Sequence, residues 1–420
     1  MKELLYTVWL SLSCRPGSDT FMKLLNKFGT PKNIYEADGD SLASCIGSKS
    51  RAYNSLINKD TERAESILDF CIRKNIGILT YFDSDFPEAL KSIKNPPVLL
   101  YYKGVLPRFN DEQLISVVGT RHLTAYGRKN TFKVAYDLAS AGAFIVSGMA
   151  IGIDGVALAG ALAAGRPTVA IIGSGIDVCY PSQHKRLARE IVKNGCIMTE
   201  YAPGTSPYRY NFPKRNRIIS ALSSATLVME GRERSGSVIT ARCAIEQRRI
   251  VYAFPGNVGN KNSEASNLLI RNGARLFTSA DDIVQDFDKL FPGKLNPFNS
   301  SSAHMPDMNG VLREFKVSCV AAGDEIFEAP HEERLKRQAE PEVQAVENYE
   351  EASQIEERVS SLFNKDTLAL YKKIPADSDC SVEQLVDGVH SLRDVMQGLL
   401  KLEIARFVTM LPGDRVKRNL

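Results

Sequence analysis

Six short apolar runs recur along the middle of the chain, and each is followed by a turn and a stretch with helical periodicity. The runs are residues 114–118, 144–146, 168–172, 196–199, 226–229 and 250–254. Strands that alternate with helices form a parallel sheet with helices on both faces. Because the runs are continuously apolar, both faces of these strands are expected to be buried. The pattern predicts an α/β fold with a Rossmann-like, doubly wound, mostly parallel sheet.

The sequence pattern of residues 1–80, which precede this sheet, predicts a second, smaller domain. Apolar residues at helical spacing over residues 1–80, with Gly29 and Pro31 as breakers, indicate a helical domain of the helix-hairpin-helix or SAM-like kind. Whether its turn at residues 46–48 meets a phosphate or only packs stays open at this point. A proline-rich connector and a short strand at residues 98–102 then lead into the Rossmann-like domain, expected to span residues 81–290.

The chain after the sheet predicts a linker and a third domain. Residues 291–357 combine low hydrophobicity with net charge, which is typical of an acidic linker. Residues 311–320 are either part of that linker or a short docked segment. Residues 358–420 predict three helices and a hairpin, the pattern of a winged-helix-like domain. Its third helix, at residues 391–402, holds two cations and one acid, so contact with DNA, contact with a protein and plain packing all stay open.

The formal charge of the chain is unevenly distributed. The whole chain carries +4, but residues 321–357 contain twelve acidic and three basic residues, so the remainder carries +13. A basic body favours a polyanionic partner. A basic protein with ordinary solvated lysines is the alternative, and charge alone does not exclude it.

Glycine and serine residues follow four of the predicted strands. Ligands of parallel sheets bind beyond the carboxyl ends of the strands, where glycines let the backbone approach them and helix N-termini offer free amides to an anion. Neither GxGxxG nor GxxxxGK[ST] occurs. We therefore predict a phosphate-binding rim that is not a dinucleotide site or P-loop, formed by Gly119, Arg121, Ser147, Gly148, Gly173, Ser235, Gly236 and Ser237.

A basic stretch with an aromatic ring lies between two of these turns. Residues 212–220 read FPKRNRIIS, preceded by Arg209 and Tyr210, and the next acidic residue is Glu230. Cations hold phosphates and a ring stacks on a base, so this composition suits a strand of nucleic acid. A solvated helix start with its isoleucines turned inward is the competing interpretation. The candidate contacts are Arg209, Phe212, Lys214, Arg215, Asn216 and Arg217.

Catalytic patterns are sparse. The chain has five histidines and neither HExxH nor GxSxG. Asp154 and Glu230 fall at the predicted rim, where they either form a carboxylate pair of a nucleotide-processing enzyme or bond to turn amides, and we favour the second. No catalytic residue, metal ligand or cofactor is predicted.

Cysteine usage predicts a reducing compartment, and the hydropathy pattern predicts no membrane span. The eight cysteines are scattered without any CxxC, which argues against structural zinc and fits the cytoplasm. No signal-peptide pattern opens the chain. The most apolar span, residues 142–173, is glycine-rich and interrupted by Asp154 and Arg166, so it is expected to be buried α/β core and not a membrane span.

A run of three apolar residues, Leu268, Leu269 and Ile270, predicts a contact between two copies of the chain. One face of a helix buries only part of such a run in its own core, so the remainder needs another surface. A self-complementary patch closes as a two-fold dimer. The predicted interface lies within residues 265–276, and it includes Asn267 and Leu276.

Taken in order, the motifs of this chain closely resemble those of the DNA-processing protein A (DprA/Smf) family. The motifs are SVVGTR at 116–121, SGMAIGIDG at 147–155, GSGIDVCYP at 173–181, FPKRNRIIS at 212–220, SGSVITAR at 235–242, FPGN at 254–257 and NLLIRNGA at 267–274. The resemblance is strong over residues 81–287 and looser at both ends.

The resemblance implies a non-enzymatic, cytoplasmic homodimer that binds and protects single-stranded DNA during natural transformation. It also implies DNA uptake by competent cells, with RecA loaded onto strands covered by single-strand-binding protein. In the implied groove Arg121 contacts a phosphate, Arg209 is a further cation and Phe212 stacks on a base, with Arg215 and Asn216 beside them.

Three positions depart from the family pattern. Many relatives carry a basic residue and then an Asn where this chain has Ser182 and His184. A direct cation contact there is therefore in question, and Lys185 is the substitute that we expect. Ala265 stands where relatives often have Gly.

Overall fold

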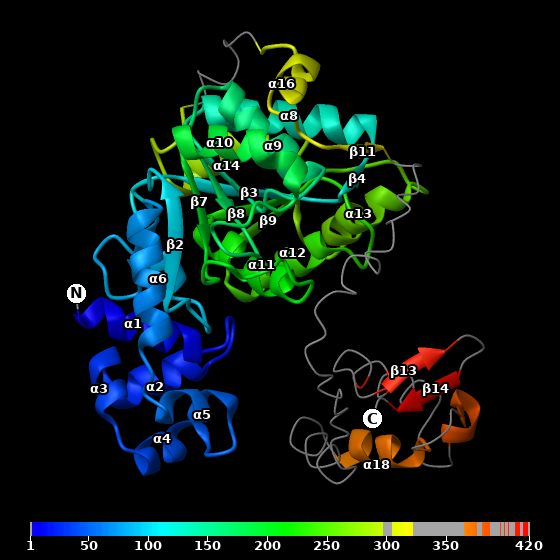
Figure 1. The fold of residues 1–420 in the computed structure, drawn as a ribbon. Helices are drawn as coiled ribbons and strands as arrows, with labels where there is room; N and C mark the ends of the chain where they lie inside the picture. Colours follow the sequence, from blue (N-terminus) through cyan, green and yellow to red (C-terminus); the bar gives the residue numbers. More distant parts are fainter. Residues whose placement is uncertain are drawn as a thin grey trace, which may run out of the picture. The chain divides into compact units, whose positions relative to one another are not determined.

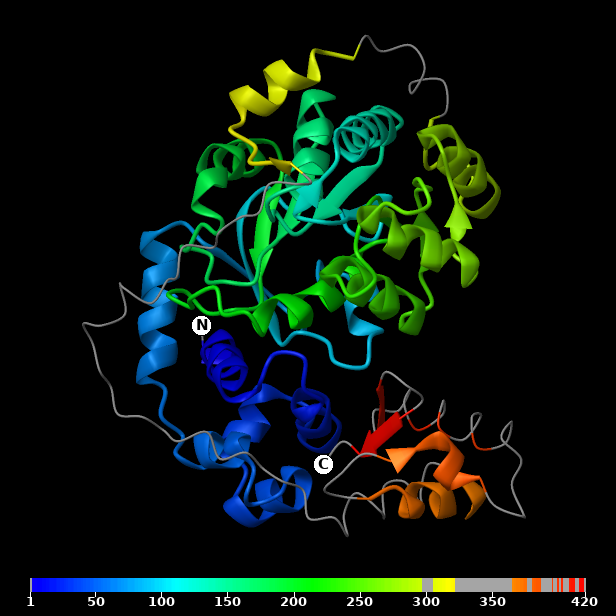
Figure 2. The same ribbon diagram turned by 90° about the vertical axis from the view of Figure 1, so that its right-hand side faces the viewer.

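The computed structural model describes residues 2–296, 305–321, 365–375, 380–386, 395, 399, 402, 408–411 and 415–418. The chain forms two compact units, Met1–Phe327 and Glu328–Leu420. The first contains the sheet predicted from sequence, and it is shown from two sides in Figures 1 and 2. Among the helices in these ranges, none is long and apolar enough to cross a membrane.

A nine-stranded sheet runs through the first unit in the order β1-β2-β7-β6-β5-β3-β8-β9-β10. The strands from β3 onward are parallel, while β1 and β2 are antiparallel at one edge. Their bounds are β1 Gly77–Thr80, β2 Leu99–Gly104, β3 Leu114–Val118, β5 Phe144–Ser147, β6 Thr168–Ile171, β7 Cys196–Thr199, β8 Ala225–Val228, β9 Ile250–Ala253 and β10 Arg275–Leu276. The Rossmann-like, mostly parallel sheet predicted from the apolar runs is confirmed.

Helices cover both faces of the sheet, and each face has its own apolar core. On one face lie α8 Ala125–Ser140, α9 Ile153–Ala163, α10 Lys185–Asn194 and α14 Ala280–Leu290. On the other lie α7 Glu88–Lys91, α11 Asn211–Leu222, α12 Gly236–Glu246 and α13 Glu264–Arg271. Two short 3-10 turns, η1 Ser182–His184 and η2 Lys261–Ser263, precede α10 and α13.

The order of the strands reverses at β3. From β3 the chain crosses through α8 to β5 on one side, whereas β8 leads through α12 to β9 on the other. Loops leave the carboxyl ends of β3 and β8 in opposite directions, and ligands of open α/β sheets bind in the crevice between such loops. The topology therefore places a candidate site beyond β3 and β8.

Six short helices precede the sheet, in agreement with the helical start predicted from sequence. They are α1 Lys2–Ser13, α2 Thr20–Phe28, α3 Pro31–Glu36, α4 Gly39–Ile46, α5 Arg51–Ile57 and α6 Glu62–Arg73. Strand β1 was not predicted, because a run of four residues after a helix carries too little periodicity to be recognised. It pairs with β2 and extends the sheet at its antiparallel edge.

Residues 311–320, which the sequence analysis left open as linker or docked segment, belong to a described stretch, residues 305–321, that folds onto the sheet domain. This stretch forms α16 Met308–Glu314 and β11 Val320–Ala321. Strand β11 pairs in parallel with β4 His122–Leu123, so this segment reaches the loop that follows β3. Residues 322–357, the main part of the predicted acidic linker, lie outside the described residues.

The second unit contains α18 Lys365–Lys373, β12 Cys380–Ser381, η3 Val382–Leu385, β13 Val408–Leu411 and β14 Arg415–Arg418. The two last strands pair as the antiparallel hairpin that the sequence predicted, and β12 pairs with β14. Most of the helix predicted at residues 391–402 lies outside the described residues, so the winged-helix-like domain stays a prediction.

Candidate nucleic-acid interface

A crevice of about 300 Å³ opens beyond β3 and β8, where the strand order reverses. A smaller pocket of about 30 Å³ adjoins it and shares Arg121, Ala150, Phe212 and Arg215 with it. Between them the two cavities bring together three residues of the basic stretch, Phe212, Arg215 and Asn216, and most of the predicted rim, namely Gly119, Arg121, Gly148, Gly173, Ser235, Gly236 and Ser237. Turns far apart in the sequence thus form one continuous site.

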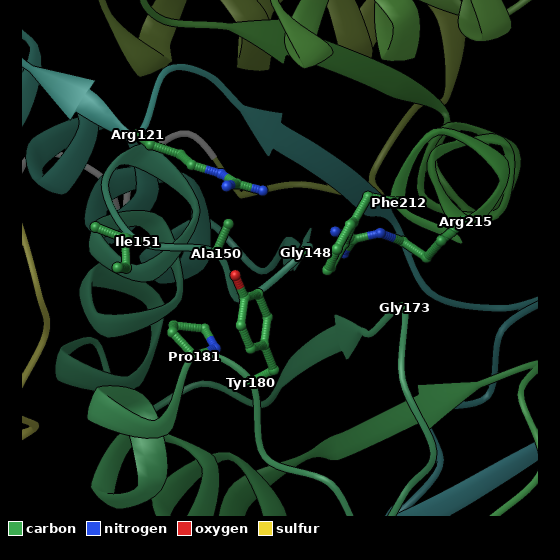
Figure 3. Close-up of a pocket in the computed structure, with 9 residues that line it drawn as sticks. All are labelled: Arg121, Gly148, Ala150, Ile151, Gly173, Tyr180, Pro181, Phe212 and Arg215. Atoms are coloured by element: carbon green, nitrogen blue, oxygen red, sulfur yellow. The ribbon is translucent and has the colours of Figure 1, made fainter. Parts of the chain in front are cut away.

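Arg121 and Phe212 face one another across the opening of the smaller pocket (Figure 3). Arg121 is exposed at the end of the β3 loop, and its guanidinium carbon lies 5.8 Å from the centre of the Phe212 ring. The ring of Tyr180, 41% exposed, lies 5.6 Å from that of Phe212. A cation and two accessible rings are therefore directed at the same small space.

Glycines let these groups approach the backbone. A Cβ atom on Gly173 would lie 3.0 Å from the ring of Phe212, so any larger residue there would push the ring outward. A Cβ on Gly148 would lie 2.5 Å from the Asp154 carboxylate and would also meet the guanidinium of Arg215. Both glycines are needed for close packing beneath the site.

Arg215, which the sequence grouped with the candidate DNA contacts, is buried under the pocket floor. Its Nη1 donates to the carbonyl of Ile171, at the end of β6. Burial lowers the pKa of Arg215 to about 10, although the nearby Asp154 carboxylate favours its charged form. Arg215 thus supplies positive charge from below, with little of its surface open to a ligand.

Arg217 is turned away from the crevice and is buried against Glu200. Its Nη2 donates to both carboxylate oxygens of Glu200, at 2.6 and 2.5 Å. Burial raises the pKa of Glu200 even though Arg217 opposes the shift. This arrangement supports a structural role for Arg217, and its DNA contact stays a prediction.

The remaining predicted cations lie outside the two cavities, on different elements. Lys214 is half-buried on α11, with its Nζ 5.7 Å from the ring centre of Tyr210. Arg209 is exposed in the loop before α11, and Lys185 is exposed at the start of α10. None of the three lines either cavity, so any contact that they make would lie outside it.

The three serines of the rim, together with Asn216 of the basic stretch, make internal hydrogen bonds. Ser147 is fully buried and donates from its hydroxyl to the carbonyl of Val117, so it lies behind the rim. The hydroxyls of Ser235 and Ser237 bond to each other at 2.7 Å at the start of α12. Asn216 donates to the carbonyl of Gly236 at 3.3 Å and joins α11 to α12.

The carboxylates of Asp154 and Glu230 bond to turns, the interpretation favoured from sequence. Asp154 accepts from the amides of Gly148 and Ala150 at 3.1 and 3.4 Å. Glu230 accepts from the amide and hydroxyl of Thr124, at 3.0 and 2.5 Å, at the start of α8. Burial raises the pKa of both carboxyls. They fix the loops that carry the rim.

The sequence did not single out all the residues that shape this interface. Tyr180 and Ala150 lie inside the motifs at 173–181 and 147–155 without a signal of their own, and both line the smaller pocket. Tyr208 and Tyr210 stack in parallel, with ring centres 5.4 Å apart, and are 51% and 61% exposed beside the basic stretch. The two-residue spacing of these tyrosines was the available signal for a second aromatic surface.

The predicted dimer residues lie on α13 and at the edge of the sheet. Leu269 is buried in the core, whereas Leu268 and Ile270 are half-buried. Leu276 is 54% exposed on β10, the last strand of the sheet. Asn267 bonds through its side chain to the amide and carbonyl of Gly256, so it anchors the helix.

The fold and site define a class: an open Rossmann-like α/β protein with a cationic, aromatic crevice at its topological switch point. Residues 77–288 match the profile of the family described as DNA recombination-mediator protein A. The DNA processing protein DprA of Streptococcus pneumoniae is 41% identical over 206 residues, covering 49% of this chain and 72% of that protein. Protein Smf of Synechocystis is 33% identical over 352 residues, covering 83% of this chain and 81% of the relative.

A solved structure agrees with these similarities. The X-ray structure of DNA processing protein A from Streptococcus pneumoniae, 32% identical, matches with a TM-score of 0.59 over 68% of this chain and 98% of that chain. The chain belongs to the DNA recombination-mediator protein A family, which confirms the resemblance seen in its motifs, and it is a DNA-binding protein of recombination.

Proposed function

We propose that this chain binds single-stranded DNA along the carboxyl edge of its sheet and mediates recombination during natural transformation by helping to load RecA. The observation that carries this proposal is the convergence of exposed Arg121 with the rings of Phe212 and Tyr180 on one small pocket. Sequence-independent binding of a single strand requires cations along the backbone and rings for its bases. Both are present within one opening.

The geometry supports a division of labour among the predicted site residues. Exposed Arg121 and Arg209 suit phosphate contacts, and the half-buried ring of Phe212 suits stacking. The free amides at the start of α12, around Gly236, suit a further phosphate. Buried Arg215 and Arg217 instead support the surface that carries these contacts.

Replacing Arg121 with alanine should weaken single-strand binding and flatten its dependence on salt. Each lost phosphate contact changes the slope of log affinity against log salt by about 0.7. Arg209→Ala should act in the same direction, and Arg73→Ala on α6, also exposed, serves as the control for charge alone. The measurement is fluorescence anisotropy of a labelled oligonucleotide at several salt concentrations. Parental affinity and slope in both rim variants would place the groove elsewhere.

We also propose that two copies pair through α13 and the β10 edge. Leu276 is exposed and Leu268 is half-buried, so together they form an apolar surface that the described part of the chain covers only in part. A two-fold pair would place two grooves on one strand and raise the effective concentration of the second contact.

Light scattering on Leu268→Glu and Leu276→Glu tests this pairing. Each variant should be monomeric at concentrations where the parent has twice the 46.4 kDa chain mass, because a carboxylate would be desolvated at the interface. Ile72→Glu, at a residue 75% exposed on α6, should leave the dimer intact. If both interface variants stay folded and dimeric, the chains pair through another surface.

The handover to RecA would use a surface off the groove, because both proteins must engage one strand at once. Full-length protein should then shorten the lag of RecA ATPase activity on DNA coated with single-strand-binding protein. If the lag is not shortened although the protein binds DNA normally, the chain does not load RecA, and the proposal of single-strand binding is unaffected.

A further inference from the structure

The segment formed by residues 308–321 lies outside the family-matched region, residues 77–288, yet it is packed onto the part of the fold that carries the rim. Helix α16 lies against α9. Leu312, on α16, is 7% exposed and joins the apolar core of that face. The segment is therefore anchored at its centre by a buried side chain.

His184 joins this segment to the loop that follows β5. It is fully buried, its Nε2 accepts from the amide of Ser318 at 2.9 Å, and its Nδ1 lies 3.1 Å from the carbonyl of Met149. Because an amide only donates, Nε2 has to be the unprotonated nitrogen, and Nδ1–H donates to Met149. Burial lowers the pKa of His184, in agreement with a neutral ring.

Gly152 links Ser318 to the loop that carries Arg121. The Gly152 amide donates to the Ser318 carbonyl at 3.1 Å. Gly152 packs so closely on the β3 loop that a Cβ there would lie 2.5 Å from the Thr120 carbonyl and 2.7 Å from the Arg121 carbonyl. Just beyond Ser318, strand β11 pairs with β4, which begins directly after Arg121. The segment thus holds the backbone of Arg121 from two sides.

We propose that residues 308–321 are a strap that fixes the Arg121 loop in its DNA-binding shape, and that His184 is the positioning residue that fastens the strap. This inference rests on the proposed single-strand binding. A released strap leaves Arg121 present but less ordered, so each binding event must then order the loop. The strap would also make residues beyond the family-matched region part of the site.

Two substitutions at residue 184 separate the two nitrogens of the ring. A Gln side chain is long enough to place an oxygen near the Nε2 position, so His184→Gln keeps an acceptor for Ser318. An Asn side chain ends near the Nδ1 position, so His184→Asn keeps a donor for Met149 and loses the acceptor. This second variant carries the residue type that the family resemblance gave for this position.

The experiment combines amide hydrogen exchange and oligonucleotide binding on the full-length chain. In His184→Asn the amides of Ser318 and Gly152 should exchange faster, and single-strand affinity should fall about 3- to 10-fold, the worth of one hydrogen bond. The salt slope should stay parental, because Arg121 is intact. His184→Gln should recover most of the affinity and protection.

Leu312→Ala removes the buried side chain that anchors the strap, so it releases the strap without changing His184. It replaces His184→Asn in the experiment if that variant does not fold. Leu312→Ala should also speed exchange at Ser318 and lower the affinity without changing the salt slope. Faster exchange with unchanged affinity, or unchanged exchange in His184→Asn, would overturn the strap and leave the proposed function intact. If the unaltered chain binds no single-stranded DNA, the proposed function is wrong, and the strap has no role in binding.

Discussion

Phe212→Ala is expected to weaken single-strand binding by about 1–3 kcal/mol, or roughly 5- to 150-fold, without changing the salt slope. The half-buried ring faces the opening of the smaller pocket, where a base can stack on it. Stacking releases no counterions, so the affinity should fall equally at every salt concentration. Anisotropy titrations at four or more salt concentrations measure both quantities.

Phe82→Ala is the matched control for the loss of an aromatic ring. Phe82 is 42% exposed and lies before the first helix of the sheet domain, where it packs against Phe21 and Tyr81. Its removal should leave affinity near the parental value. A change of slope in Phe212→Ala as large as that of Arg121→Ala would contradict stacking, because it would mean that a phosphate contact was lost.

Arg217→Met is expected to lower the free energy of unfolding by about 3–5 kcal/mol, because it leaves the Glu200 carboxylate buried without its partner. The two side chains are only 11% and 9% exposed, so water does not compensate for the lost charge. Chemical denaturation of the purified variant measures the change. Folded Arg217→Met should still bind single strands with the parental salt slope, since Arg217 faces Glu200 and not the crevice.

The double variant Glu200→Leu with Arg217→Met tests the cause of that loss. Replacing both members of a buried ion pair by apolar residues is often neutral, so most of the lost stability should return. If the double variant is no more stable than Arg217→Met, the uncompensated charge is not the cause. A reduced salt slope in Arg217→Met would instead support the DNA contact first expected for this residue.

The sheet could be predicted from sequence because its strands are buried on both faces and therefore apolar throughout. The rim could be predicted because glycines mark the turns at the carboxyl ends of those strands. The edge strand β1 lacked such a signal, since four residues do not establish a period.

The roles of individual cations could not be read from local sequence. Residues 212–217 show a run of positive charge, but the partner of Arg217 is Glu200, which directly follows β7, and that of Arg215 is a carbonyl of β6. Only the folded chain separates buried cations from exposed ones. In the same way, the local sequence at His184 shows only a departure from the family pattern. It does not show the hydrogen bond to Ser318, because Ser318 lies 134 residues further along the chain.

The most direct test of the central claim is binding of the unaltered full-length chain to an oligonucleotide of about 20 nucleotides, longer than the roughly 4–16-nucleotide sites of other single-strand-binding folds. Single-stranded and duplex forms are compared by anisotropy across a salt series, and the strands are then run on a denaturing gel. We predict preferential binding to the single strand, an affinity that falls linearly in log salt, and intact DNA. Absence of salt-dependent binding to the single strand, or turnover of DNA or mononucleotides, would contradict the account.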